Sequence, residues 1–187
     1  MKNNLEDFIY IKRIIPKVFC DKIIREIKDL NWEKHKWYKG KEKIYDEPDK
    51  TELEILFSTV EQHKFIQPFI SKALDEYQNI PHINPLKEKF LNNLSRLRFN
   101  RYTTNTLMKP HYDLIRDIWP SGDSGVPIVS IVGNLNHNYQ GGDFYIRNKK
   151  YELKDGYIML FPSTFIFNHE VKAITKGERY SFVSWAF

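Results

Sequence analysis

Near residue 94 the spacing of the apolar residues changes, and this change restricts the chain to a small set of folds. Before it, apolar side chains recur every three to four residues in residues 16–32 and again in residues 58–77, which predicts two amphipathic helices. After it, short runs rich in β-branched and aromatic residues alternate with turn signals, which predicts seven or eight short strands. Helices followed by many short strands indicate an antiparallel β-structure with helices packed on one sheet.

The ends of the two helices can be predicted. The first is expected to begin at Pro16, since proline suits the first turn of a helix. Its apolar face is expected to consist of Phe19, Ile23, Ile27 and Leu30. The second is expected to begin at Ser58, where Ser-Thr-Val-Glu has the form of a capping box, and to kink or restart at Pro68. Between the helices, residues 35–50 are polar, charged and aromatic, which predicts a loop or an irregular hairpin.

The strand-rich second half favours a jelly roll of the cupin type, a double-stranded β-helix, over other antiparallel barrels and sandwiches. The expected fold class is therefore α+β, mostly β with N-terminal helices packed on one sheet. A chain of 187 residues has the length of a single domain. Within it, residues 1–93 would form a helical N-terminal support region and residues 94–187 the jelly roll.

Composition and charge exclude several classes of protein. Apolar residues make up 41% of the chain, too much for a disordered protein, yet no apolar run approaches the roughly 20 residues of a membrane helix. The first residues lack the apolar core of a signal peptide, and Cys20 is the only cysteine, so a cytoplasmic location is expected. The net charge of +5 comes from scattered basic residues. Residues 147–150 are expected to be a solvated hairpin tip rather than a nucleic-acid contact.

His111 and Asp113 stand two residues apart after a proline. On a strand, alternate side chains face the same way, so both can be directed at one point while Tyr112 faces away. His169, in a strand predicted over residues 165–171, can supply a third ligand if the strands are neighbours. Two histidines and one carboxylate on one face of an ion are typical of non-haem iron(II) oxygenases. The alternatives are a chance match that caps a turn and, for His169, a structural buried histidine.

Arg179 and Ser181 favour the interpretation as a metal site. They stand two apart on the last predicted strand, ten residues after His169, and so share one face. A buried guanidinium is unfavourable unless an anion lies beside it. A dicarboxylate that chelates a metal through one end would offer its far carboxylate to Arg179, with a hydrogen bond from Ser181. The alternative is a surface arginine on an edge strand.

Three segments in fixed order carry a resemblance to a known family. They are RYTTNTLMKPHYD at 101–113, VSIVGNLNHNYQGGDFYI at 129–146 and GYIMLFPSTFIFNHEVKAITKGERYSFVSW at 156–185. Residues 94–187 resemble the catalytic domain of the iron(II)- and 2-oxoglutarate-dependent dioxygenases, and within them the prolyl 4-hydroxylase-like branch. Residues 8–27 are similar, more weakly, to the helical N-terminal part of these proteins.

The resemblance implies a set of ligands and cofactors. His111, Asp113 and His169 would bind Fe(II), and residues 94–187 would be the catalytic core. The co-substrates would be 2-oxoglutarate and O2, with ascorbate a candidate reductant. Arg179 falls where this branch has the lysine or arginine that binds the far carboxylate of 2-oxoglutarate, which makes it the fourth catalytic residue.

The resemblance also assigns residues around the co-substrate. Tyr102 falls where a tyrosine often hydrogen-bonds 2-oxoglutarate, and Ser181 matches the accompanying hydroxyl. Asn134 replaces a tyrosine of many relatives, and its shorter amide would reach the carboxylate only through a water. Trp185 matches a tryptophan that lines the substrate channel in some prolyl hydroxylases. Core packing is the alternative for Tyr102 and Trp185.

Arg116 and Trp119 are the remaining candidate substrate residues, in the loop at 114–127 that varies within the family. The alternative for both is a solvated loop. Gly141 and Gly142 indicate a tight turn or bulge rather than a phosphate site, since no helix follows them.

The expected function is hydroxylation of an unactivated C–H bond, on a peptidyl residue such as proline. A related oxygenase that acts on a small molecule or free amino acid is the main alternative. A nucleic-acid demethylase is disfavoured because no second arginine follows Arg179 on the last strand. A non-catalytic jelly-roll binding module is disfavoured because it would not need the combination of His111, Asp113, His169 and Arg179. A membrane partner is not expected, and the sequence leaves the oligomeric state open.

Overall fold

The computed structural model describes residues 4–39, 44–45, 48–91, 93–114 and 126–187. The strands are β1 (Tyr10–Arg13), β2 (Glu33–Lys34), β3 (Tyr38–Lys39), β4 (Ile44–Tyr45), β5 (Glu54–Phe57), β6 (Arg98–Tyr102), β7 (Met108–His111), β8 (Val129–Asn134), β9 (Gln140–Gly141), β10 (Phe144–Ile146), β11 (Lys149–Tyr151), β12 (Tyr157–Pro162), β13 (His169–Val171), β14 (Ile174–Lys176) and β15 (Arg179–Ala186). The helices are α1 (Lys17–Ile27) and α2 (Val60–Gln78), with short 3-10 helices at Leu5–Phe8 and Phe165–Phe167.

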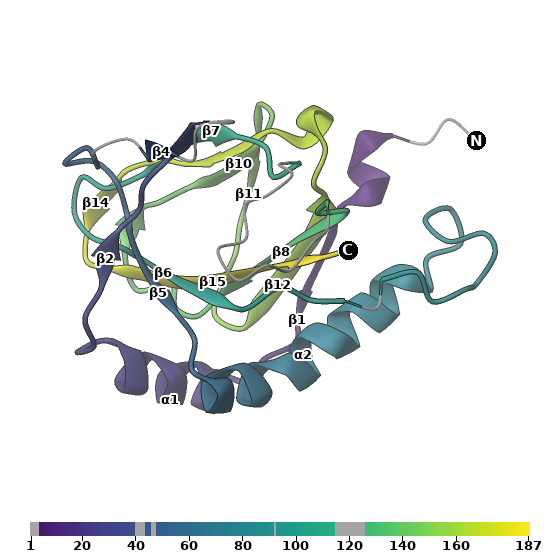
Figure 1. Ribbon diagram of the computed structural model, residues 1–187, viewed down its shortest axis with the longest axis horizontal. Coiled ribbons are helices and arrows are strands. Elements are labelled where there is room, and N and C mark those ends of the chain that lie inside the picture. Colours follow the sequence, from purple (N-terminus) through teal and green to yellow (C-terminus); the bar gives the residue numbers. More distant parts are fainter. Residues whose placement is uncertain (1–3, 40–43, 46–47, 92, 115–125) are drawn as a thin grey trace.

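Two antiparallel sheets face each other, and both helices cover the outer face of the larger one (Figure 1). The large sheet has the strand order β1-β12-β8-β15-β6-β5-β2, and the small sheet has the order β11-β10-β13-β7. Along the chain, β6, β8, β12 and β15 of the large sheet alternate with β7, β10 and β13 of the small sheet. This alternation is the double-stranded β-helix, so the predicted fold class is confirmed. Among the described residues, no helix is long and apolar enough to cross a membrane.

The last strand shows how the sequence places side chains on the two faces of the large sheet. In β15, Tyr180, Phe182 and Ala186 belong to the apolar cluster under the helices. Arg179, Ser181 and Trp185 have side chains that point the other way and line the cavity between the sheets. Because strand side chains alternate, one eight-residue strand supplies both the core under the helices and one wall of the site.

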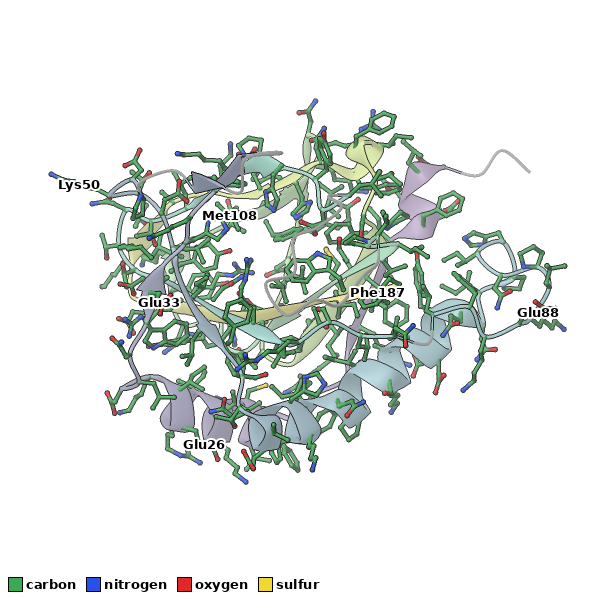
Figure 2. The ribbon with its side chains drawn as sticks, viewed as in Figure 1. Glu26, Glu33, Lys50, Glu88, Met108 and Phe187 are labelled. Carbon is green, nitrogen blue, oxygen red and sulfur yellow. The ribbon has the colours of Figure 1, made fainter. Side chains whose placement is uncertain are left out.

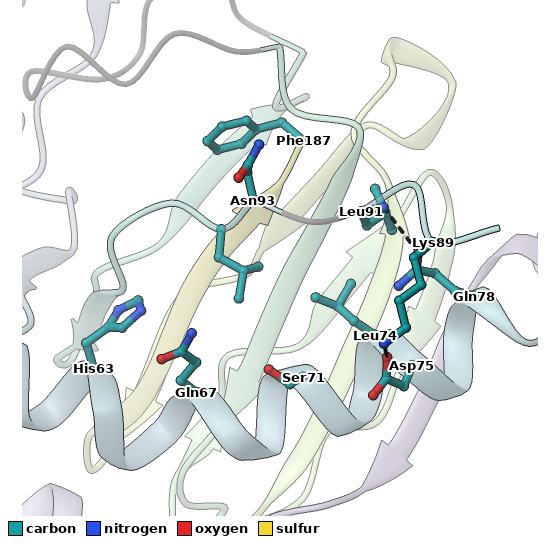
Figure 3. A pocket seen from close by; sticks show the side chains of 11 residues that line it. His63, Gln67, Ser71, Leu74, Asp75, Gln78, Lys89, Leu91, Asn93 and Phe187 are labelled. Atoms are coloured by element: carbon teal, nitrogen blue, oxygen red, sulfur yellow. Dashed lines mark hydrogen bonds and ion pairs between the residues drawn. The ribbon is translucent and has the colours of Figure 1, made fainter.

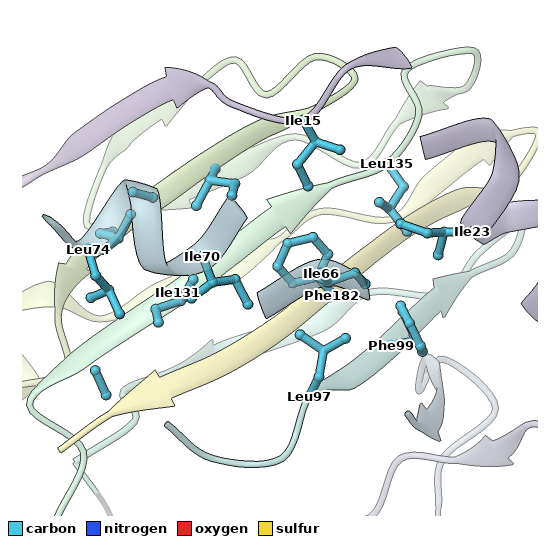
Figure 4. Packing of buried hydrophobic residues seen from close by; sticks show 14 of the residues in the cluster. Ile15, Ile23, Ile66, Ile70, Leu74, Leu97, Phe99, Ile131, Leu135 and Phe182 are labelled. Carbon is cyan, nitrogen blue, oxygen red and sulfur yellow. The ribbon is translucent and has the colours of Figure 1, made fainter. Parts of the chain in front are cut away.

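The main apolar cluster lies between the helices and the large sheet (Figure 4). Its helical members are mainly Cys20, Ile23 and Ile27 from α1 and Ile66, Ile70, Ala73, Leu74 and Tyr77 from α2. Each large apolar side chain buried there stabilises the fold by about 1.5–3 kcal/mol. Gly133 leaves room for the Phe182 ring on the neighbouring strand β15, because a Cβ at this position would lie 2.0 Å from that ring. A second apolar cluster fills the space between the two sheets and includes Met108 of the small sheet (Figure 2).

Three details of the helix predictions were wrong. Leu30 lies beyond the end of α1 and is 44% exposed, so it does not belong to the buried face. The capping box of α2 is formed by Thr59 and Gln62, one residue later than predicted from Ser58. Pro68 does not restart the helix, because α2 continues through it from Val60 to Gln78; proline removes one backbone donor, but the buried face of the helix holds the turn in place. A kink at Pro68 stays a prediction.

The N-terminal half contains more β-structure than its apolar spacing predicted. β1 pairs with β12, and β5 lies between β6 and β2, so three strands that precede residue 94 extend the large sheet. β3 and β4 pair as the irregular hairpin predicted for residues 35–50. In the second half, the strand predicted over residues 165–171 begins only at His169, because residues 165–167 form a 3-10 turn.

Candidate active site

The predicted metal-binding side chains lie together on the small sheet. His111 is the last residue of β7, Asp113 follows two residues later, and His169 is the first residue of β13. The two strands pair antiparallel with His111 opposite His169. One ligand atom from each of the three side chains lies within 4.8 Å of the others. These residues could therefore hold one divalent ion from one side, with two histidines and one carboxylate as ligands.

Backbone hydrogen bonds orient both imidazole rings. Nδ1 of His111 bonds the carbonyl oxygen of Lys109 at 2.8 Å, and Nδ1 of His169 bonds that of Phe167 at 3.2 Å. Because a carbonyl oxygen only accepts, each Nδ1 carries the hydrogen, which leaves the lone pair on Nε2. The Nε2 atoms of His111 and His169 lie 3.5 and 3.7 Å from the carboxylate oxygens of Asp113. The lone pairs that would bind a metal therefore face the carboxylate.

The protonation states of His111 and Asp113 suit a metal ion. Burial and the neighbouring His169 lower the pKa of His111 to about 4, so its ring is neutral at pH 7. Burial alone would raise the pKa of Asp113, but the rings of His169 and His111 and a hydrogen bond from Ser130 lower it overall. A neutral imidazole and an ionised carboxylate can bind a metal without first losing a proton.

Ser130 holds Asp113 from the opposite sheet. Its Oγ donates to Oδ2 of Asp113 at 2.6 Å and lies 2.9 Å from Oγ of Ser163. The carboxylate is thus fixed by a strand of the large sheet, although it follows a strand of the small one.

Ser130→Ala is expected to lower the affinity for Fe(II) about 10–100-fold, the usual effect of removing a hydrogen bond that orients a metal ligand. Anaerobic equilibrium titration of the metal-free protein with Fe(II) measures this change. Ser184→Ala is the matched control, because Ser184 is also buried but hydrogen-bonds Ser95 away from the cavity. Equal Fe(II) affinity of Ser130→Ala and the wild type would contradict the role of Ser130.

Arg179 and Ser181 form a second polar region, which lines the same cavity from the large sheet. Both residues are 1% exposed. Among the described residues, neither Nη1 nor Nη2 of Arg179 has a hydrogen-bond partner, and neither does Oγ of Ser181. Buried donors without partners are unfavourable, and a guanidinium with a neighbouring hydroxyl matches a carboxylate that accepts two parallel hydrogen bonds. The donor set therefore fits the far carboxylate of 2-oxoglutarate.

Asn134 and Tyr102 hold the guanidinium of Arg179. Oδ1 of Asn134 accepts from Nε of Arg179 at 3.0 Å, while Nδ2 of Asn134 donates to the carbonyl oxygens of Asn136 and Leu153. Since both amide hydrogens are used and Asn134 does not line the cavity, its position suits orienting Arg179. The ring of Tyr102 lines the cavity, and its centroid lies 4.9 Å from Cζ of Arg179. Direct contact of either residue with 2-oxoglutarate stays a prediction.

The predicted substrate residues divide into two groups. Trp185, 8% exposed, lines the same cavity as the metal-binding triad and Arg179. Arg116 and Trp119 lie outside the described residues. A role in substrate binding stays a prediction for all three.

Arg98 also lines this cavity, although the sequence analysis did not identify it. A sequence signal existed, because Arg98, Asn100 and Tyr102 alternate along β6 and so share one face.

Trp37 is a further neighbour of the metal site that was not predicted. Its ring packs edge-on against His111 with centroids 5.4 Å apart, and its Nε1 donates to Oε1 of the buried Glu52 at 2.8 Å. Lys109 forms an ion pair with the same oxygen at 2.9 Å. No sequence pattern connects Trp37 with His111, because the contact joins two distant segments of the chain.

A separate groove runs along α2 beside the C-terminal residue (Figure 3). It is lined largely by polar side chains, and an ion pair between Lys89 and Asp75, 3.3 Å long, lies across it. Within the described part of the chain, His111, Asp113 and His169 are the one group of three metal-capable side chains. The candidate metal site among these residues therefore lies in the cavity between the sheets.

Comparison with known proteins agrees with this geometry. Residues 97–187 match the sequence model of the 2OG-Fe(II) oxygenase superfamily. Comparison with curated protein sequences gives no significant match.

Solved structures of three prolyl hydroxylases have a similar fold. The viral collagen prolyl hydroxylase of Paramecium Bursaria Chlorella virus-1, in complex with 2OG, has a TM-score of 0.67 and 17% identity over 96% of this chain and 94% of that one. A Pseudomonas putida prolyl-4-hydroxylase has a TM-score of 0.64 and 19% identity over 97% and 95%. A Trichoplax adhaerens prolyl hydroxylase, in complex with a hypoxia inducible factor peptide fragment, has a TM-score of 0.67 and 15% identity over 97% and 84%.

At these identities the structural likeness shows the fold alone, while the sequence match assigns residues 97–187 to the 2OG-Fe(II) oxygenase superfamily. Residues 97–187 contain the three metal-binding side chains and Arg179. They therefore form an oxygenase domain of the 2OG-Fe(II) superfamily, whose members use Fe(II), 2-oxoglutarate and O2.

Proposed function

We propose that this 2-oxoglutarate-dependent dioxygenase hydroxylates an unactivated C–H bond on a peptidyl residue, with proline the leading candidate. The observation that carries the reaction is the single cavity that joins the metal-binding triad to the unpartnered donors of Arg179 and Ser181. A ligand that bridges these two regions needs a chelating group at one end and a carboxylate at the other, as 2-oxoglutarate has.

The residues of the chain have separate tasks in this reaction. His111, Asp113 and His169 would hold Fe(II) on one face, so that its other positions open into the cavity. When bound there, Fe(II) would let O2 react with 2-oxoglutarate and the substrate, so that one oxygen atom enters succinate as carbon dioxide is lost and the other enters the C–H bond. Arg179 and Ser181 would fix the far carboxylate. Apolar cavity residues such as Met108, Phe144 and Val171 would keep water out.

Two features support a peptide as substrate. The likeness to the prolyl hydroxylases covers 96–97% of this chain, including the N-terminal half, and one of those proteins is in complex with a peptide fragment. Trp37, which contacts His111, directly precedes the β3–β4 hairpin, so an extended chain that approaches the metal would meet this hairpin. Trp185 on the opposite sheet would then contact the target residue.

Incubation of the enzyme with Fe(II), 2-oxoglutarate, ascorbate and a proline-containing peptide library tests this proposal. The expected result is a mass gain of one oxygen atom on library peptides, located on proline by fragmentation, and no gain with Asp113→Ala. A pool of free amino acids and other metabolites is treated in parallel. Oxygen gain in that pool and none in the peptides would contradict a peptidyl substrate.

A further inference from the structure

Arg98 is a second arginine whose side chain lines the cavity between the sheets. It lies on β6 and is partly buried, with Asn100 and Tyr102 on the same face of the strand. Its Cζ lies 5.5 Å from the centroid of the Trp185 ring. The same cavity is lined by His111, Asp113 and His169, so Arg98 shares it with the metal-binding triad.

Arg98 is held in the same way as Arg179. Nε of Arg98 donates to Oδ1 of Asn100 at 3.1 Å, as Nε of Arg179 donates to Oδ1 of Asn134 at 3.0 Å. Within the described residues, the terminal nitrogens of Arg98 form no hydrogen bond or ion pair. The cavity thus contains two guanidiniums, each fixed through Nε by an asparagine and each with its outer edge available to a ligand.

The charges of the assembled site do not balance without a further anion. The two negative charges of 2-oxoglutarate offset the two positive charges of Fe(II), and Asp113 offsets one guanidinium. Among the described cavity residues, Asp113 is the one carboxylate, and it is a metal ligand. One positive charge remains, and burial already lowers the pKa of Arg98, so an anion beside it would be stabilising.

We infer that Arg98 binds a carboxylate of the substrate and thereby selects substrates with a carboxylate near the oxidised C–H bond. The inference rests on the proposed hydroxylation, because it concerns the substrate of the same site. The carboxylate can belong to an acidic side chain next to the target residue of a peptide or to a free amino acid. Both sources offer the group that a guanidinium with two available nitrogens binds best.

A small carboxylate tests Arg98 without knowledge of the substrate. Enzyme loaded anaerobically with Fe(II) and saturating 2-oxoglutarate, so that Arg179 is engaged, is titrated with propionate by calorimetry. The wild type should bind one propionate per chain, and Arg98→Gln should bind it about 10–100-fold more weakly. Arg98→Lys keeps the charge but loses the two parallel donors of the guanidinium, so its propionate affinity should lie between those of the wild type and Arg98→Gln.

Arg101→Gln is the matched control. Arg101 lies on the same strand, but its Nε is 2.7 Å from Glu54 and it does not line the cavity, so propionate affinity should stay at the wild-type value. Equal propionate affinity of wild type and Arg98→Gln, or no saturable binding by the wild type, would overturn the inference.

Matched substrates then identify the source of the carboxylate. Proline peptides with a neighbouring glutamate or glutamine, and free amino acids with their α-amides, are compared by succinate release above the substrate-free rate. In the pair that the enzyme oxidises, the substrate with the carboxylate should have about 10–100-fold higher kcat/KM than its amide. Arg98→Gln should remove this preference. An unchanged acid-to-amide ratio in Arg98→Gln would overturn the inference even if peptides are hydroxylated. Propionate binding at Arg98 without peptide oxidation would instead contradict the proposed peptidyl substrate.

Discussion

Asp113→Ala is expected to lower the affinity for Fe(II) by more than about 100-fold and to abolish succinate formation. Changes to groups that only orient a metal ligand already reduce metal affinity about 10–100-fold, and Asp113 is itself the one carboxylate of the triad. Its loss would leave two imidazole ligands, which carry no negative charge to offset that of the ion. Anaerobic Fe(II) titration and a succinate assay at saturating 2-oxoglutarate measure the two effects.

Asp155→Ala is the matched control for this experiment. Asp155 is also a buried aspartate with a histidine partner, His137, but it does not line the cavity. This variant should bind Fe(II) with wild-type affinity. Succinate formation by Asp113→Ala at the wild-type rate would mean that the metal is held elsewhere.

Arg179→Ala is expected to raise the KM for 2-oxoglutarate by more than about 100-fold. Each hydrogen bond to a charged group contributes about 1.5–3 kcal/mol, and the variant removes a guanidinium whose two terminal nitrogens would both bind the far carboxylate. The affinity for Fe(II) should change little, because Arg179 is hydrogen-bonded to Asn134 and not to a metal-binding side chain. The initial rate of succinate release as a function of 2-oxoglutarate concentration gives the KM.

Two further variants, Arg179→Lys and Ser181→Ala, separate the contribution of charge from that of hydrogen-bond geometry to binding of the far carboxylate. Lysine keeps the charge but lacks the two parallel donors of a guanidinium, so the KM for 2-oxoglutarate should fall between those of Arg179→Ala and the wild type. Ser181→Ala removes one hydroxyl and should raise the KM less than Arg179→Ala does. An unchanged KM in Arg179→Ala would remove the assignment of this residue to 2-oxoglutarate.

The metal-binding triad could be predicted because its geometry follows from local rules. His111 and Asp113 are two apart, and the alternation of an extended strand is enough to bring them to one side. His169 required only that two strands be neighbours, which a jelly roll provides. The same alternation placed Arg179 beside Ser181, so these predictions needed no knowledge of loops.

Arg98 could have been found by the same rule. It precedes Tyr102 by four residues on β6 and therefore shares its face, but no role was predicted for it.

Contacts between distant segments could not be predicted from spacing. β1 pairs with β12, which lies more than 140 residues further along the chain, and β5 joins the sheet through β6. Trp37 likewise contacts His111 from a distant part of the chain. Such pairings depend on the assembled fold, and a four-residue strand leaves too short a pattern to distinguish it from a loop.

The most direct test is anaerobic calorimetric titration of the wild type with 2-oxoglutarate and with 2-oxobutanoate, which lacks the far carboxylate. Each ligand is titrated with Fe(II) present and after its removal by a chelator. The expected result is one 2-oxoglutarate per chain with Fe(II) present, much weaker binding without it, and weak binding of 2-oxobutanoate in both cases. Equal binding of the two ligands, or 2-oxoglutarate binding that does not depend on Fe(II), would contradict a site with a metal at one end and Arg179 at the other.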